Sequence, residues 1–298
     1  MTNTSTNIKR PHHLSPIGLG AMPLSLVNRP TETQAIDVIH QFIAMGGNFI
    51  DTANVYGFDE SDKGHNERLI QRALKTLHQT DHVLVATKGG ATRPNNGWSF
   101  KGGGHPKSLR AACEQSLVNL QRNEHGLYYL HGPDIDIPLE DSLGELIRLK
   151  DEGKIKQLGV ANFTLDQLSM TTNLTSLFAV QNRCNPFCKG DITSGVMNYC
   201  KTNNIYYIPY CPLGGSFDHA KLNQSPLFIN LAAKYQVSSY SLCLAWLLHK
   251  GDYVIPIPGM NTLAQLEENF KATTLSIEAN DLEAMNQFPD LYLPQHFD

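Results

Sequence analysis

Short apolar runs alternate with longer amphipathic stretches along the whole chain. Each run is bounded by polar or turn-forming residues and has the length of a buried strand rather than of a helix. Eight such runs occur, at residues 17–22, 49–50, 83–86, 127–130, 155–160, 177–180, 205–208 and 254–257. Most of them are followed by a segment with helical periodicity, so we expect strands and helices to alternate from one end to the other.

The stretches between the runs have apolar positions three and four residues apart, which is the spacing of one helix face. Thr31 opens the first of these stretches, and Gln34 stands where a capping box places its second polar residue. The apolar face of this helix is formed by Ala35, Val38, Ile39, Phe42 and Ile43. Two later helices are predicted in the same way, one with Leu109, Cys113, Leu117 and Leu120 on one side and one with Leu143, Leu146 and Ile147.

Strands that alternate with helices predict a parallel sheet, and eight such units predict a closed (β/α)₈ barrel of the TIM type. The chain has 298 residues, somewhat more than the ~250 that are usual for one barrel. No linker or shift in composition divides it, so residues 1–298 are expected to form a single domain. An open doubly wound sheet is the alternative, but no GxGxxG motif follows the first strand to bind a dinucleotide in that fold.

The composition is that of a globular protein with a large core, because 41% of the residues are hydrophobic and 17% are charged. The net charge of −4 gives no reason to expect a nucleic acid or an anionic membrane as partner. The first ten residues lack the apolar segment of a signal peptide, so we expect a cytoplasmic protein. The six cysteines contain no CxxC pair and no zinc-site spacing, so no metal is expected.

Four polar side chains come at or just after the ends of three consecutive predicted strands. Asp51 ends the second run, and Tyr56 follows it in a loop closed by Gly57. Lys88 follows the third run and His131 follows the fourth. Because the carboxyl ends of parallel strands meet at one end of a barrel, where active sites lie, we expect these side chains to converge.

These residue types suit the reduction of a carbonyl group. Hydride transfer to a carbonyl carbon leaves charge on the oxygen, so a proton donor is needed there, and Tyr56 is that donor in this interpretation. Lys88 is expected to lower the pKa of the phenol by stabilising the phenolate, and Asp51 to hold the ammonium in place. His131 is expected to orient the carbonyl group through a hydrogen bond.

Each of these residues, taken alone, has a simpler explanation. Asp51 could cap a helix or turn, His131 could be a structural histidine, and Tyr56 could be a surface turn residue. Lys88 is hardest to explain in this way, because a lysine directly after an apolar strand loses its hydration unless it is paired. The combination of the four favours a functional site.

Further residues at strand ends suit a nicotinamide cofactor. The side-chain amides of Asn162 and Gln181, at the ends of the fifth and sixth strands, match a carboxamide. Tyr210, after the seventh strand, offers an aromatic face on which the ring could stack. The segment that follows, Pro212, Leu213 and Gly214 with Gly215 after it, permits close backbone approach to a pyrophosphate, although an ordinary tight turn is the alternative.

The motifs at these positions resemble those of the aldo-keto reductase family. The matching segments occur in the order typical of the family and span nearly the whole chain: DTANVYG at 51–57, the strand ending in Lys88, LHGPD at 130–134, GKIKQLGVANF at 153–163, QN at 181–182, YCPLGG at 210–215 and IPGMNTLAQLEEN at 257–269. The resemblance implies a barrel that reduces aldehydes or ketones, with the catalytic residues Asp51, Tyr56, Lys88 and His131.

The resemblance also implies which residues bind the adenosine end of the cofactor, namely Gly259, Met260, Asn261, Gln265, Glu268 and Asn269. One common form of the pattern has lysine at the position of Gly259 and arginine at that of Gln265, cations that bind the 2′-phosphate of NADP(H). Family members with the IPG form generally still use NADPH. NADP(H) is therefore the expected cofactor, with NAD(H) as the alternative.

The substrate is expected to be a small aldehyde or ketone. YCPLGG followed by the IPG form is also similar to bacterial pyridoxal reductases, which makes pyridoxal a candidate. The tail after Phe288 is short, so the substrate pocket is expected to be comparatively open. A monomer or a small homo-oligomer is expected.

Two other classes of function stay open. A metal-dependent barrel hydrolase could use Asp51 and His131 as ligands, but a clustered ligand set such as His-x-His on a strand is missing. A regulatory protein could keep the barrel and the cofactor with little turnover, as the potassium-channel β subunits, which resemble reductases, do. The complete set of four catalytic residues favours an enzyme.

Overall fold

The computed structural model describes residues 14–77, 81–94 and 97–291. Within these ranges, seven parallel strands form one sheet in the order β1 to β7, so that each strand pairs with the next along the chain. The strands are β1 Leu19–Gly20, β2 Phe49–Asp51, β3 Leu84–Gly89, β4 His125–Leu130, β5 Ile155–Ala161, β6 Ala179–Gln181 and β7 Tyr206–Tyr207. Sequential parallel pairing is the arrangement that the alternating pattern predicts.

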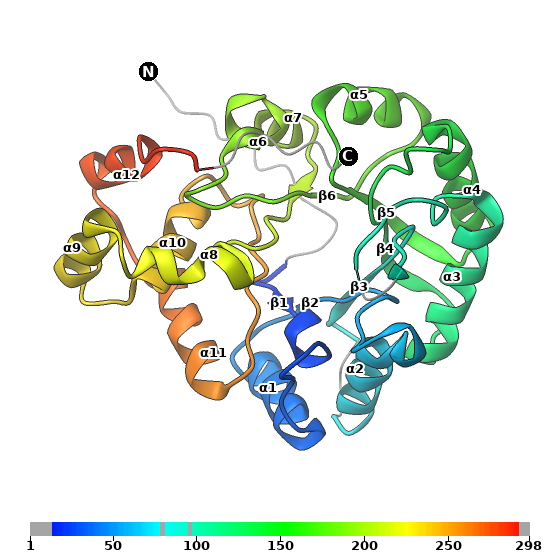
Figure 1. Cartoon of the computed structure of the whole chain (residues 1–298), viewed down its shortest axis with the longest axis horizontal. Coiled ribbons are helices and arrows are strands. Elements are labelled where there is room, and N and C mark those ends of the chain that lie inside the picture. Colours follow the sequence, from blue (N-terminus) through cyan, green and yellow to red (C-terminus); the bar gives the residue numbers. More distant parts are fainter. Residues whose placement is uncertain (1–13, 78–80, 95–96, 292–298) are drawn as a thin grey trace.

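The helices lie outside the strands and surround them (Figure 1). The α-helices are α1 Glu32–Ala44, α2 His65–Lys75, α3 Pro106–Leu120, α4 Leu139–Asp151, α5 Leu165–Leu174, α6 Gly190–Thr193, α7 Val196–Thr202, α8 Gly215–Leu222, α9 Pro226–Tyr235, α10 Ser239–Leu248, α11 Leu263–Phe270 and α12 Ala279–Asn286. Single turns of tighter helix occur at η1 Met22–Leu24, η2 Glu60–Asp62 and η4 Lys271–Thr274.

Helix α1 begins where the sequence predicts. The side chain of Thr31 accepts a hydrogen bond from the backbone of Gln34, whose own side chain accepts one from the Thr31 backbone, so the capping box is confirmed. The predicted apolar face is buried at Ala35, Val38 and Phe42. This face attaches the helix to the outside of the sheet.

The predicted strand at 254–257 is not a regular strand, although it occupies the place of one. Val254 forms an isolated parallel bridge with Tyr207 of β7, and Gly259 forms one with Gly20 of β1. The segment therefore lies between the first and last strands and closes the sheet into a barrel. The predicted (β/α)₈ fold class is correct, and only the regularity of this eighth strand was overestimated.

Two prolines explain why this segment is irregular. The backbone N–H groups of Gly18 and Gly20 donate to the carbonyl groups of Pro256 and Pro258. A proline has no N–H to donate in return, so the ladder with β1 is incomplete at Pro256 and Pro258. On the other side Ile255 still donates to Tyr207, which keeps the segment attached to β7.

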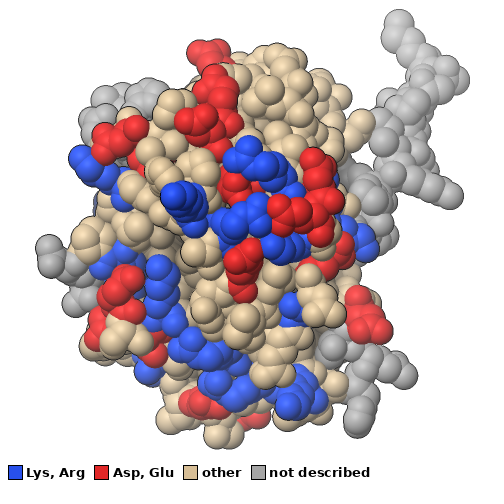
Figure 2. Space-filling view, turned by 90° about the vertical axis from the view of Figure 1, so that its right-hand side faces the viewer, with Lys and Arg blue, Asp and Glu red and all other residues tan. Residues whose placement is uncertain are grey.

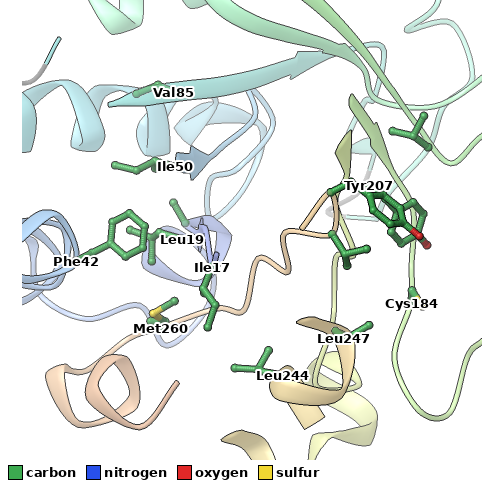
Figure 3. Close-up of a cluster of buried hydrophobic side chains, with 14 of the residues drawn as sticks. Ile17, Leu19, Phe42, Ile50, Val85, Cys184, Tyr207, Leu244, Leu247 and Met260 are labelled. Carbon is green, nitrogen blue, oxygen red and sulfur yellow. The ribbon is translucent and has the colours of Figure 1, made fainter. Parts of the chain in front are cut away.

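Alternating side chains along the strands divide the core into two layers. One set points into the barrel and forms a cluster with members such as Phe49, Leu84 and Tyr129. The other set points outward and packs under the helices. Figure 3 shows part of this outer layer, where Ile17, Leu19, Phe42, Ile50, Val85, Tyr207 and Met260 are labelled.

Charged side chains on the face that carries α3 and α4 are of both signs and interspersed (Figure 2). Arg110 of α3 forms ion pairs with Glu145 and Glu152, and Lys154 binds Glu114. None of the helices described is long and apolar enough to cross a bilayer. The first ten residues, and residues 292–298 of the short tail discussed above, lie outside the described ranges.

Candidate active site

The alternation of side chains brings three of the predicted residues into the barrel at one end. Phe49 and Asp51 lie two residues apart on β2, so both face inward, and Leu84, Ala86 and Lys88 do the same on β3. His131 directly follows β4, two residues after the inward-facing Tyr129. Parallel pairing in register puts these positions at the carboxyl end of the barrel, as predicted.

Lys88 is the centre of the site. Its Nζ donates hydrogen bonds to Asp51 Oδ2 at 2.6 Å, to the backbone oxygen of Thr52 at 2.8 Å and to the hydroxyl of Tyr56 at 3.2 Å. The side chain is 0% exposed and that of Asp51 is 4% exposed. Three acceptors match the three N–H groups of an ammonium, so the lysine is held in its charged form.

Burial and pairing act in opposite directions on this ion pair. Burial lowers the pKa of Lys88 and raises that of Asp51, because both groups lose the hydration of their charged forms. Each is opposed by the charge of the other and by the hydrogen bond between them. Gln181 Nε2 adds a second hydrogen bond to Asp51, at 2.7 Å from Oδ1, which satisfies the other carboxylate oxygen.

The net pKa of the Tyr56 phenol is raised, not lowered as expected from the neighbouring Lys88. Burial raises the pKa of Tyr56 well above its ordinary value, and the Asp51 carboxylate raises it further. The phenol is therefore fully protonated at neutral pH. A buried side chain also excludes the idea that Tyr56 is a surface turn residue.

The imidazole of His131 is neutral. Burial lowers its pKa well below the ordinary value, and the charge of Lys88 adds to the effect. The ring centroid lies 6.0 Å from that of Tyr56. Its Nδ1 is buried and has no hydrogen-bond partner among the described residues, so one ring nitrogen is not used by that part of the protein.

An aromatic wall that the sequence reasoning missed surrounds this cluster. Trp98 lies 6.0 Å from Tyr56 and 6.4 Å from His131, and Phe100 lies 5.9 Å from His131, all measured between ring centroids. The guanidinium of Arg93 stacks on Trp98 at 4.8 Å. The available signal was an aromatic pair in the glycine-rich loop directly after Lys88.

The predicted nicotinamide-binding residues are bonded to the same cluster. Asn162 has a left-handed backbone with φ 62°, which a short amide side chain tolerates. Its Nδ2 donates to the backbone oxygen of His131 at 2.9 Å, and its Oδ1 accepts from the hydroxyl of Tyr210 at 2.7 Å. Together with Gln181, these residues place amide groups and an aromatic ring beside Tyr56, and this set of groups fits a nicotinamide.

The next predicted segment has the backbone of an anion-binding turn. Gly214 and Gly215 have φ angles of 95° and 71°, and helix α8 begins at the second of them. A Cβ on Gly214 would lie 2.8 Å from Cβ of Asp218, so only glycine fits. Pro212 is buried and Leu213 packs on the core, which fixes the turn. A helix N-terminus with close backbone approach fits a phosphate group.

The residues predicted for the adenosine end form a separate group around the start of α11. Gly259 is exposed, whereas Met260 is fully buried in the outer core (Figure 3), so Met260 presents no accessible surface to a ligand here. The backbone of Asn261 donates to the side chain of Gln265 at 2.8 Å. Asn269 is also buried.

Glu268 of this group is already engaged by the neighbouring helix. It accepts hydrogen bonds from Ser238 and Ser241 at the start of α10 and from Lys271. Although burial acts in the opposite direction, hydrogen bonds from Lys271, Ser238 and Ser241 lower its pKa to about 2. Lys271 is thus paired with Glu268 at 2.6 Å.

The structure also explains why no lysine stands at position 259. A Cβ on Gly259 would lie 2.6 Å from Cγ of Pro23 in η1, so a larger side chain does not fit unless η1 moves. Within the described ranges, no group of three or more His, Cys, Asp or Glu side chains is placed to hold a metal ion.

The fold is a parallel α/β barrel, and buried Asp, Lys and Tyr side chains converge at the carboxyl ends of its strands. These features define a class of barrel proteins with the functional site at that end. The chain belongs to the Aldo/keto reductase family, whose family model matches residues 16–289. A probable aldo-keto reductase of Glycine max is 31% identical over 298 residues, covering 90% of this chain and 84% of the relative. An uncharacterised oxidoreductase of Schizosaccharomyces pombe is 28% identical over 268 residues, with 88% and 83% covered.

Solved structures agree on the fold. A thermostable aldo-keto reductase in complex with the inhibitor epalrestat has a TM-score of 0.78 at 24% identity, covering 92% of this chain and 95% of that one. An aldo/keto reductase from Klebsiella pneumoniae, in complex with NADP and acetate, has a TM-score of 0.77 at 23% identity, with 96% and 95% covered. At these identities the likeness establishes the barrel itself.

Proposed function

We propose that the chain, as one barrel domain over residues 1–298, reduces the carbonyl group of an aldehyde or ketone with NADP(H), and that Tyr56 is the general acid. The observation that carries the proposal is the set of three hydrogen bonds from Lys88 to Asp51, Thr52 and Tyr56. Burying a charged lysine costs free energy, and buried charges of this kind are concentrated at functional sites.

The cofactor, when bound, supplies the hydride that reaches the carbonyl carbon. Tyr56, protonated because burial raises its pKa, gives its proton to the carbonyl oxygen as negative charge develops there. The hydrogen bond from Lys88 to the phenol oxygen at 3.2 Å then stabilises the phenolate that is left. Asp51 keeps the ammonium charged, and the neutral imidazole of His131 donates a hydrogen bond to the same carbonyl oxygen.

Asn162 and Gln181 are proposed to bind the carboxamide of the nicotinamide, and Tyr210 to stack on its ring. The amides of Asn162 and Gln181 already bond to neighbouring residues. Cofactor binding would therefore replace some of these hydrogen bonds with bonds to the carboxamide. We propose NADP(H) rather than NAD(H), with Gly214, Gly259 and the start of α11 along its phosphates and adenosine. The Klebsiella pneumoniae structures with NADP and NADPH support this choice.

The aromatic wall supports a flat substrate. Trp98, Phe100 and the ring of His131 offer faces and edges to an aromatic aldehyde, and pyridoxal is the candidate that we propose to test first.

The test follows the oxidation of NADPH and, separately, of NADH by the reduced-nicotinamide absorbance, with pyridoxal and 4-nitrobenzaldehyde as substrates. Tyr56→Phe should abolish reduction while cofactor affinity is unchanged. Tyr207→Phe is the matched control, since it also removes one buried hydroxyl, the one bonded to Asp191 on the outer side of β7. Full turnover by Tyr56→Phe would eliminate Tyr56 as the acid, and tight NADPH binding without any wild-type turnover would favour the regulatory alternative.

A further inference from the structure

Two of the three groups that surround Lys88 Nζ are themselves held by one residue that lies outside the catalytic cluster. That residue is Asn66, in the first turn of α2, and it is completely buried. Its side-chain oxygen accepts a hydrogen bond from Thr52 Oγ1 at 2.6 Å. Its backbone N–H donates to the backbone oxygen of Tyr56 at 3.2 Å. Asn66 therefore contacts both the residue that offers a carbonyl to Lys88 and the residue that carries the phenol.

The other end of the Asn66 amide is equally constrained. Its Nδ2 donates to the backbone oxygen of Ala21 at 2.8 Å and to Ser25 Oγ at 2.7 Å, so both N–H groups are used. Ala21 and Ser25 flank the turn η1 that follows β1. The amide thus connects the ends of β1 and β2, and it has one orientation in which all its hydrogen bonds are made.

The first backbone N–H groups of α2 form hydrogen bonds with the loop that follows β2. The first N–H groups of a helix have no partner within it. Here the N-cap Gly64 has no side chain to cap them, and its own N–H donates to the backbone oxygen of Asn54 at 2.7 Å. With the bond from Asn66 to Tyr56, the loop after β2 accepts hydrogen bonds from the helix start, so the helix fixes the loop that carries the phenol.

We infer that Thr52 and Asn66 are positioning residues for proton transfer, acting by holding the Thr52 carbonyl and the Tyr56 loop at their distances from Lys88. The inference rests on the proposed role of Tyr56 as the acid. It predicts that the loss of one buried hydroxyl at Thr52 affects the chemical step rather than the binding of the cofactor.

Thr52→Val tests this with little change of shape, since it removes only the hydroxyl and keeps the carbonyl that binds Lys88. The matched control is Thr171→Val in α5, which also removes a fully buried hydroxyl, one that donates to the backbone oxygen of Gln167 at 2.7 Å. We expect kcat of Thr52→Val to fall on the order of 10-fold below that of the control, since small misplacements of catalytic groups have effects of this size or larger. Cofactor affinity, measured by quenching of tryptophan fluorescence, and the KM for the carbonyl substrate should not change.

A kcat for Thr52→Val equal to that of Thr171→Val, in an active wild-type background, would overturn the inference and leave the proposed function intact. No reduction by the wild type itself would instead refute the proposed function. If Thr52→Val does not fold, Ser25→Ala carries the test, because it removes one acceptor of the Asn66 amide at the far end of the same network. An unchanged kcat in that folded variant would also count against the positioning role.

Discussion

Replacing Lys88 by methionine separates the charge of the lysine from its volume. The variant keeps a long apolar side chain in the barrel but leaves the Asp51 carboxylate buried with only the amide of Gln181 as a hydrogen-bond donor among the contacts that the structure describes. A carboxylate in this position either stays charged without a counter-ion or takes up a proton. Both outcomes reduce the stability of the folded state at neutral pH.

The size of the effect follows from the geometry. At 2.6 Å the attraction between the two charges is about 6 kcal/mol for an effective dielectric constant of ~20. Desolvation of the two ions opposes this attraction, and the removal of one partner of a buried pair typically costs about 3–5 kcal/mol. For a chain of this length, that corresponds to a fall in Tm of about 5–8 °C.

The assay is thermal unfolding of Lys88→Met, Asp51→Asn and the double variant, together with carbonyl reduction. The asparagine side chain at position 51 keeps an oxygen for Gln181, so the double variant contains no unpaired charge. It should therefore regain most of the stability lost in Lys88→Met, while its reductase activity stays absent. A double variant as unstable as Lys88→Met would show that the charge pair is not the cause, and a stable Lys88→Met would refute the reasoning altogether.

Three further outcomes are expected. Tyr210→Ala should weaken cofactor binding at least 10-fold, because stacking and the hydrogen bond to Asn162 are both lost, whereas Tyr210→Phe should keep most of it; equal affinities in a fluorescence titration would argue against stacking. Gly259→Ala should lower Tm through contact with Pro23, and Pro23→Ala in the same chain should restore it. Burial lowers the pKa of His125 from 6.5 to about 4, so between these two pH values the unfolded state binds more protons than the folded state. The free energy of unfolding should therefore fall by about 3 kcal/mol as the pH drops through this range. The denaturation midpoints of His125→Gln should show a smaller fall.

The sequence was sufficient to predict the barrel and the convergence of Asp51, Tyr56, Lys88 and His131 at one end of it. Apolar runs that end in polar residues define both the strands and the end of the barrel at which those residues meet, and these features are local. The capping box of α1 was predicted for the same reason.

Features that depend on packing were not predictable in this way. The sequence shows a cation near Tyr56, but the pKa of the phenol is set by burial, which only the folded chain defines. Met260 lies in a segment that matches a cofactor site, yet its side chain points into the core. Trp98 stands far along a loop, and its place beside His131 depends on how that loop folds back.

The segment that closes the barrel between β7 and β1 also leads into the proposed cofactor site. Neither Pro256 nor Pro258 can donate a backbone hydrogen bond to β1, so local opening of the native state should begin there. The same segment runs directly into Gly259, at the proposed adenosine end. A cofactor bound on that stretch stabilises the closed state by mass action, and slower amide exchange at Gly18 and Gly20 would report its binding.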